Sequence, residues 1–330
     1  MEQKNKRTLI FVLFSVCLIV IGLILAVTIG AKRISLIEIY NSIANYDETL
    51  NHMLIRDVRI PRALCVLITG GILAVTGAMI QGVTRNPIAE PSLLGISQGA
   101  TLVIAIFYAL EIAITSLNIM IAAFIGAFFC GILVIGFTMK KAGNMSVGRL
   151  LLAGTAMSTF FISLTTIIGL LTNRSQLIGF WVSGGFRNAS WSDVTMLLII
   201  GIPGMLVTIL LSGKINLLSL GDDVAIGLGE NPSKIRFVTL LIMIPMCAVA
   251  VAVGKNIGFV GLIIPQITRT IIGSNYKRII PCSFLLGAAL LTFADIFARM
   301  MFDPYETPIG VFTAIIGVPF FIAMARKERG

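Results

Sequence analysis

Charged residues inside apolar segments are the groups of this chain that are best placed for chemistry. Asp295 is the one acid that stands firmly within such a segment, and Arg299 follows it four positions later. That spacing puts both side chains on one face of a helix, where the two charges can neutralise each other. A carrier driven by protons or sodium should keep acids in its spans, because a charge there costs about 2.5–3.5 kcal/mol on insertion scales and is retained for function. One self-paired carboxylate therefore gives little support for such a carrier.

The sequence motifs of enzymes are missing. The single histidine, His52, cannot form a metal site of the His-x-x-x-His or Glu-x-x-His kind. Neither Gly213-Lys214 nor Gly254-Lys255 is followed by Ser or Thr, so the chain has no phosphate-binding loop of its own. The five cysteines lie in or beside apolar segments without a Cys-x-x-Cys pair and are interpreted as small hydrophobes. We therefore expect no cofactor and no catalytic residue; if ATP drives this protein, another polypeptide binds the ATP.

The composition is that of an integral membrane protein. Hydrophobic residues make up 57% of the 330 residues and charged residues only 12%, whereas soluble domains carry about 25% charged residues. Each helical crossing of a bilayer needs roughly 20 apolar residues. The candidate spans, one of them short, are Thr8–Ile29, Ala63–Thr84, Pro91–Leu110, Ile112–Met139, Leu150–Thr172, Val194–Gly213, Phe237–Gly254, Asn256–Thr268, Ile279–Met301 and Thr307–Ala325. The sequence thus predicts an all-α integral membrane protein with about ten transmembrane helices in a single domain, 1–330.

Charge is distributed unevenly over the predicted loops. With the amino terminus placed in the cytoplasm, most of the 25 lysines and arginines fall on the inner side, and the outer side is nearly neutral. This positive-inside bias predicts that both termini are cytoplasmic. The net charge of +10 is therefore attributed to the orientation of the chain in a lipid bilayer and not to binding of a nucleic acid. Lys4, Lys6 and Arg7 precede an apolar core of about 22 residues, which is long for a signal peptide, so we expect a retained first helix.

Two outer loops carry apolar or aromatic residues. The first, 31–57, contains the amphipathic stretch Ile34–Tyr40, which predicts a short helix at the membrane surface. The second, 173–193, carries Phe180, Trp181, Phe186 and Trp191. Aromatic residues at that depth form an interfacial belt or face a substrate, and the sequence leaves both interpretations open.

The inner loop at about 217–235 differs in composition from the other loops. Its residues 217–232 combine the paired acids Asp222 and Asp223 with three glycines and a spaced set of apolar residues. Such a segment suits a short helix that is presented to a soluble protein in the cytoplasm. A solvated connector is the alternative interpretation.

Two further features concern packing between the predicted helices. A polar, proline-broken turn, Asn86–Gly95, joins two uncharged apolar segments, although unpaired backbone groups are costly beside lipid. Small-residue pairs such as Gly70-x-x-x-Ala74 let neighbouring helices approach closely. Such pairs arise often by chance among 32 glycines, so their specificity is low.

Several motifs along the chain occur together in one known family. In chain order they are Arg59-x-Pro-Arg62, Gly71–Gly77 with Gln81, Asn86–Gly95, Arg149–Gly154, Trp181–Gly185, Leu220-Gly221, Gly258–Pro265, Ala294–Arg299 and Glu306–Gly310. By these motifs the chain resembles, over roughly residues 55–325, the permease subunits of bacterial type II ABC importers for iron–siderophore complexes, haem and vitamin B12. One departure is Gln266, which stands where the family usually has histidine. An amide can replace the hydrogen bonds of an imidazole but cannot titrate near neutral pH.

The resemblance implies a ten-helix permease that pairs with a second permease subunit around a central path. A substrate-binding protein would dock outside and two ATPases inside, in the cytoplasmic membrane of a bacterium. The implied docking positions for the binding protein are Arg56, Arg59, Arg62 and Arg299, although Arg299 can also pair with Asp295. Those implied for ATPase coupling are Leu220, Gly221, Asp222, Asp223, Gly227, Leu228 and Gly229. Those implied for the path or its gate are Gln81, Asn86, Pro87, Val147, Gly148, Trp181, Gly184 and Gly185.

Outer arginines at the start of a span can face water without the cost of burial, so we expect Arg59 and Arg62 to be accessible to a partner.

The resemblance implies an importer without its own ATPase site, most often for an iron(III)–siderophore complex. Haem or cobalamin import is the alternative, and an ion-coupled secondary transporter is a weaker one. Whether the permease pair is a homodimer or a heterodimer cannot be derived from one chain.

Overall fold

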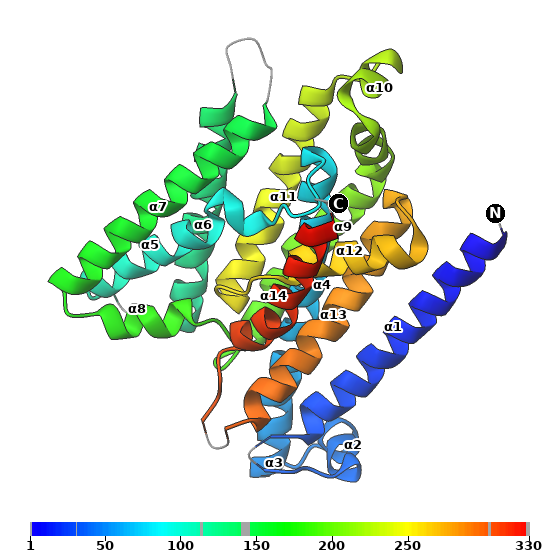
Figure 1. Ribbon diagram of the computed structural model, residues 1–330. Helices are drawn as coiled ribbons and strands as arrows, with labels where there is room; N and C mark the ends of the chain where they lie inside the picture. Colours follow the sequence, from blue (N-terminus) through cyan, green and yellow to red (C-terminus); the bar gives the residue numbers. More distant parts are fainter. Residues whose placement is uncertain (1, 31, 113–114, 140–145, 303–304, 328–330) are drawn as a thin grey trace.

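The computed structural model describes residues 2–30, 32–112, 115–139, 146–302 and 305–327. These residues form a bundle of helices (Figure 1), and an isolated β-bridge pairs Phe302 with Tyr305. The helices are α1 (Glu2–Thr28), α2 (Leu36–Ala44), α3 (Leu50–Met53), the π-helical η1 (Leu54–Arg59), α4 (Ile60–Thr84), the 3-10 helix η2 (Pro91–Leu94), α5 (Ile96–Ala109), α6 (Ser116–Thr138), α7 (Val147–Leu171), α8 (Ser175–Val182), α9 (Trp191–Leu220), α10 (Asp222–Gly227), α11 (Pro232–Gly254), α12 (Val260–Ile272), α13 (Tyr276–Met300) and α14 (Ile309–Lys327).

The prediction of an all-helical membrane protein is confirmed. Within the described residues, seven helical segments are long and apolar enough to cross a bilayer, and three shorter apolar helices accompany them. The three shorter ones are α5, α12 and α14, and each of the ten predicted spans overlaps one of these ten segments. Because α12 has only 13 residues, the number of full crossings stays a prediction.

Side-chain caps and small residues explain how the bundle is built locally. Asn231 accepts a hydrogen bond from the amide of Lys234 at 3.1 Å, and Pro232 stands at the first position of α11, where its missing N–H costs nothing. The predicted close approach at Gly70-x-x-x-Ala74 is confirmed. A Cβ on Gly70 would lie 2.4 Å from the carbonyl oxygen of Gly287 in α13. Only residues without a side chain allow that contact.

Helix α4 is the centre of the bundle. It packs against α9, α11, α12 and α13, and most of its residues are buried. Helices α5, α6 and α7 form a second group that joins α11, and α1 lies on the opposite side against α13 (Figure 1). Helices α1, α7 and α9 keep many large apolar side chains on the outside, as helices that face lipid or another subunit do.

The bundle has two distinct ends in Figure 1, which we name the α2 end and the α10 end. The α2 end holds α2, α3 and the connection from α13 to α14, with α8 toward the same side. The α10 end holds α10, the start of α1 and the start of α7. The surface helix predicted at Ile34–Tyr40 is found as α2, whose side chains Leu36, Ile37, Tyr40 and Ile43 are exposed.

Two connections enter the bundle instead of staying at its ends. Helix α4 ends at Thr84, the next residue Arg85 has a left-handed φ of 54°, and the chain then folds back through Pro91. In the connection from α11, the residue just before α12 is Phe259, which also has a left-handed φ of 70°. A Cβ on Gly261 would lie 3.2 Å from Pro91 and 3.0 Å from the carbonyl oxygen of Leu73. Since Leu73 is midway along α4, the two connections meet inside the bundle.

Candidate functional site

A cluster of buried charges ties three elements together at the α2 end. The guanidinium of Arg62 in α4 donates to Asp295 of α13 at 2.9 Å and to Glu306 of the α13–α14 connection at 2.7 Å. The side chain of Asp295 is 1% exposed and that of Arg62 is 10% exposed. Arg299 also contacts Asp295, with 3.1 Å between Nε and Oδ2. The predicted pairing of Asp295 and Arg299 is therefore confirmed, with Arg62 as an additional partner.

Two arginines of this end cap the last turn of α1. Arg59 donates to the carbonyl oxygens of Val27 at 2.6 Å and Thr28 at 3.2 Å. Arg299 donates to those of Ala26 at 3.1 Å and Ile29 at 3.3 Å. The last carbonyls of a helix have no partner within the helix and carry partial negative charge, so cations stabilise them.

The expectation that Arg59 and Arg62 face water is wrong. Arg59 is 7% exposed and Arg62 is 8% exposed, because the carbonyls of α1 and the buried carboxylate of Asp295 need donors. Arg56 alone among the four candidate docking arginines is an exposed residue, and its guanidinium lies 5.0 Å from the centre of the Tyr46 ring. A docking role for the other three stays a prediction.

Glu306 links this cluster to the surface. Its carboxylate also contacts Arg187, with 3.4 Å between Nε and Oε2, and the side chain of Arg187 is 59% exposed. Burial alone would raise the pKa of the Glu306 carboxyl, but hydrogen bonds and positive charge from Arg62 and Arg187 hold the pKa below its ordinary value.

The departure residue Gln266 lies between two of the predicted path residues. Its side-chain amide donates to Oε1 of Gln81 at 3.1 Å and to the carbonyl of Pro87 at 2.9 Å. Gln81 in turn donates to the carbonyls of Gly261 and Leu262, both at 3.2 Å. Gln266 thus connects α12 with the end of α4 and with the turn after it, and it does so by hydrogen bonds that need no proton transfer.

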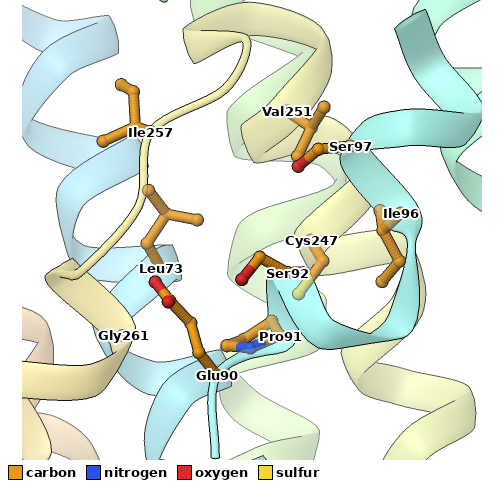
Figure 2. Close-up of a pocket in the computed structure, with 10 residues that line it drawn as sticks. All are labelled: Leu73, Glu90, Pro91, Ser92, Ile96, Ser97, Cys247, Val251, Ile257 and Gly261. Carbon is orange, nitrogen blue, oxygen red and sulfur yellow. The ribbon is translucent and has the colours of Figure 1, made fainter. Parts of the chain in front are cut away.

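A carboxylate caps α12 inside the bundle. Oε1 of Glu90 accepts a hydrogen bond from the amide of Phe259 at 2.6 Å. Figure 2 shows Glu90 beside Leu73, Pro91 and Gly261, at the edge of a small cavity. The cavity has a volume of about 20 Å³, which is room for a single water molecule. It is far too small for a chelate or a haem.

Three predicted path residues lie toward the α2 end, next to the connection between α11 and α12. Trp181, in α8, is 4% exposed, and its Nε1 has no hydrogen-bond partner in this structure. The amide of Gly185 donates to the carbonyl of Gly254 at 3.2 Å, and Gly184 has a φ of 76° that favours glycine.

The aromatic residues of this loop do not behave alike. Trp181 and Phe186 are buried in the core, so the belt interpretation is wrong for both. Trp191 is 45% exposed and donates from its indole nitrogen to the carbonyl of Arg56 at 3.0 Å, as a residue of an interfacial belt can. The side chain of Phe180 lies outside the described residues.

The predicted gate residues Val147 and Gly148 lie elsewhere. They form the first turn of α7 at the α10 end, where Gly148 is exposed. The structure therefore does not bring all the candidate path residues into one site. It groups Gln81, Pro87 and Gln266 inside the bundle, Trp181, Gly184 and Gly185 near the α2 end, and the gate pair at the α10 end.

The predicted coupling segment contains the short helix α10 and presents apolar side chains outward. Leu220, Val224, Ile226 and Leu228 are 42–68% exposed. Gly227 and Gly229 are exposed as well, and Gly229 has a left-handed φ of 77°. Asp223 is exposed, whereas Asp222 turns inward to Arg236, with 2.6 Å between Oδ1 and Nη2. The paired acids therefore have different surroundings.

A hollow opens beside α10. It has a volume of about 580 Å³ and lies between the start of α7 and the start of α11, with Ser146, Arg149, Asp222, Ile226 and Glu230 among its lining residues. An exposed apolar patch next to a hollow is typical of a surface that receives another protein.

Some residues of these sites were missed in the sequence. Glu90 and Glu306 stand in the quoted motifs, but nothing in the sequence shows that Glu90 reaches Phe259 or that Glu306 reaches Arg62. In the sequence Arg236 is one of many basic residues on the predicted inner side, yet it is 4% exposed. Among the described residues no group of three His, Cys, Asp or Glu is placed to hold a metal ion.

Fold and site together define a helical permease of the type II ABC importer class. A solved inward-facing structure of a metal-chelate type ABC transporter superposes with a TM-score of 0.84 at 28% identity, over 96% of this chain and 98% of that one. The model of the FecCD transport family matches residues 18–327, and the chain belongs to this family.

Individual relatives agree with this assignment. The chain is 40% identical to the iron(3+)-hydroxamate import system permease protein FhuB of Bacillus subtilis, over 99% of this chain and 86% of that protein. It is 35% identical to the Fe(3+)-citrate import system permease protein YfmD of the same organism, over 99% and 98%. It is 32% identical to the hemin transport system permease protein HmuU of Yersinia pestis, over 96% and 95%.

Proposed function

We propose that this chain is the membrane-spanning subunit of an ATP-driven importer for an iron(III)–siderophore complex. The observation that carries the proposal is the similarity over nearly the whole chain to the hydroxamate permease, with 40% identity. The interior supports it, because the cavity lined by Glu90, Pro91 and Gly261 has room for one water molecule and not for a substrate. A permease that receives its cargo from a binding protein needs no tight site of its own.

A hydroxamate complex is the first candidate substrate, and ferric citrate is the second. The citrate permease is 35% identical over a similar length, whereas the haem permease is 32% identical. These differences are small, so the substrate is to be decided by transport measurements.

The path is proposed to lie between this chain and a second permease subunit. Helices with exposed apolar side chains, among them α7, α9 and α14, are available for that contact and for lipid. Val147 and Gly148 would then form part of the inner gate. Trp181, Gly184 and Gly185 would lie beside the outer part of the path, and Gln81, Asn86 and Pro87 beside its middle.

The α10 end is proposed to face the cytoplasm, together with both termini. Lys214, Lys234, Lys277 and Arg278 all belong to this end by their helices, in agreement with the positive-inside rule. The exposed residues Leu220, Val224, Ile226 and Leu228, with Gly227 and Gly229, would form the surface on which an ATPase subunit docks. The substrate-binding protein would dock at the α2 end, with Arg56 in direct contact.

The transport cycle follows from these contacts. Closure of the two ATPases upon ATP binding would move α10, and the permease subunits would tilt against each other. The path then opens outward, receives the chelate from the binding protein and reopens inward. This chain would supply the moving walls and no catalytic group, because hydrolysis belongs to the ATPases.

Reconstitution tests this function. The chain, its permease partner, the ATPases and the binding protein are placed in liposomes, and uptake of radioactive iron is measured with a ferric hydroxamate, ferric citrate and haem in turn. We expect uptake of an iron chelate that requires ATP and the binding protein. Uptake that persists without ATP and follows an ion gradient would instead establish a secondary transporter.

A further inference from the structure

Arg236 of α11 is a buried residue whose side chain bonds to two other helices, α4 and α10. Its side chain is 5% exposed, and Nε donates to the carbonyl of Val83 in α4 at 3.1 Å. Nη2 donates to Oδ1 of Asp222, the first residue of α10, at 2.6 Å. One guanidinium of α11 thus holds both the end of the central helix and the start of the proposed coupling helix.

Asp222 is held from a second side. Nη2 of Arg85 lies 3.5 Å from the same Oδ1, and Arg85 is the left-handed residue that follows α4. Helix α10 itself packs against α9 and α11. The side chains of Arg236, Asp222 and Arg85 therefore form the link that reaches from α10 to the end of α4.

This link is not explained by stability. A buried ion pair repays its desolvation only when its geometry is good, and apolar side chains of similar volume often do as well. The side chain of Asp222 is itself 35% exposed and the neighbouring Asp223 is exposed, so neither acid of this turn needs a buried partner for the sake of its own charge. The planar guanidinium of arginine holds two acceptors in fixed directions and so favours one defined geometry. A flexible lysine does not fix the geometry in this way.

We propose that Arg236 is a positioning residue of ATP-coupled transport, which transmits displacement of α10 to the end of α4 and to the turn that follows. From there the displacement reaches α12, because Pro87 is bonded to Gln266 at 2.9 Å and Glu90 to Phe259 at 2.6 Å. The inference rests on the proposed function of α10 as the ATPase contact. Asp222 belongs to this internal link and not to the docking surface.

The test compares variants of the reconstituted importer by the substrate moved per ATP hydrolysed. Arg236→Met removes both bonds, Asp222→Ala removes one, and Arg236→Lys keeps the charge but reaches one acceptor at a time. We expect the ratio to fall about fivefold or more in Arg236→Met, the lower range of measured couplings between sites, while the ATPases still co-purify. The double variant should be no worse than Arg236→Met, since the two residues act as one unit.

Lys214→Met is the matched control. Lys214 forms an ion pair with Glu230 at 3.1 Å on the same side of the molecule, and this pair joins α9 to the connection between α10 and α11. Its ratio should equal that of the wild type. A wild-type ratio in Arg236→Met overturns the proposal, and so does loss of the ATPases without a change of ratio in the remaining complexes. If Arg236→Met does not accumulate in the membrane, Arg236→Lys is measured in its place. A wild-type ratio in Arg236→Lys would then overturn the proposal.

A second measurement separates this inference from the proposed function. Spin labels at the exposed residues Thr195 of α9 and Thr270 of α12, with the exposed Cys17 replaced by serine, report movement without any substrate. We expect ATP to change their distance in the wild type and in Lys214→Met, but not in Arg236→Met. The same change in Arg236→Met overturns the link. Absence of iron uptake by a wild type that still shows the distance change would refute only the proposed cargo.

Discussion

Glu90 and Phe259 join the turn after α4 to the start of α12 by a hydrogen bond of 2.6 Å between a carboxylate oxygen and a backbone amide. The amide belongs to the residue just before α12, where the helix carries partial positive charge. A carboxylate there stabilises the helix and satisfies a donor that would otherwise be unpaired inside the bundle. Discontinuous helices of transporters use their ends in this way where backbone enters the membrane.

Removal of this carboxylate should weaken the junction. Glu90→Ala leaves the Phe259 amide without its acceptor, which costs about 1–3 kcal/mol, and we expect a lower unfolding temperature and reduced transport. Glu90→Gln keeps an oxygen acceptor and should retain most of both. Ser92→Ala, in the lining of the same cavity, is the control for a change of volume. Equal stability of Glu90→Ala and the wild type in thermal unfolding would show that water replaces the carboxylate.

Gln266→His should be tolerated. The glutamine contributes hydrogen bonds to Gln81 and Pro87, and a neutral imidazole can donate to one of them. We expect iron uptake near neutral pH to stay within about twofold of the wild type, a difference of roughly 0.4 kcal/mol. Gln266→Leu, which has a similar volume but no donor, should lower uptake further than Gln266→His. A collapse of uptake in Gln266→His alone would mean that this amide is a specific adaptation of the path.

The spans could be predicted from the sequence because apolar composition and length decide them locally. The short helix at Ile34–Tyr40 and the pairing of Asp295 with Arg299 could also be predicted, because each depends on the spacing of residues along a single helix. The partners of Arg62 could not, because Glu306 is 244 positions away and its approach depends on how α13 and α14 pack. Arg59 shows the same limit, because its acceptors are the unpaired carbonyls of a helix that ends about 30 positions earlier.

The charge state of Glu306 should make the α2 end sensitive to acid. Its pKa in the folded protein lies below the ordinary value of about 4.3, because Arg62 and Arg187 favour the ionised form. A lowered folded pKa contributes stability that is fully present above the unfolded pKa and is lost as the pH falls through the folded pKa. Wild type should therefore be more stable than Glu306→Gln at neutral pH, and the difference should begin to shrink as the pH falls below about 4.3 and disappear only below the lowered folded pKa. Thermal unfolding in lipid nanodiscs at several pH values measures it; a constant difference contradicts the ion pairing.

The exposed apolar surface of the coupling segment should be needed for ATPase docking. Leu228→Asp places a charge on a side chain that is 63% exposed, and Gly227→Trp adds bulk where a Cβ would meet no neighbour. Neither change disturbs the interior, so we expect normal insertion with loss of the co-purified ATPase. Lys277→Asp, on another exposed part of the α10 end, serves as a control for added acid. Retention of the ATPase in the Gly227→Trp, Leu228→Asp double variant would remove this surface from the interface.

Variants of the arginines at the α2 end distinguish a role in docking the binding protein from a role in stability. Arg56→Glu changes an exposed cation, so we expect weaker association of the binding protein, a reduced dependence of that association on salt, and an unchanged unfolding temperature. Arg62→Glu places a third carboxylate beside Asp295 and Glu306, and breaking a buried pair costs about 3–5 kcal/mol. Its main effect should therefore be a lower unfolding temperature and little protein in the membrane. Arg62→Met with Asp295→Leu removes both charges and should recover part of the stability, because no buried carboxylate remains at position 295. If Arg62→Glu instead accumulates normally and loses only its binding protein, the arginine is released from the cluster on docking and contacts the partner directly.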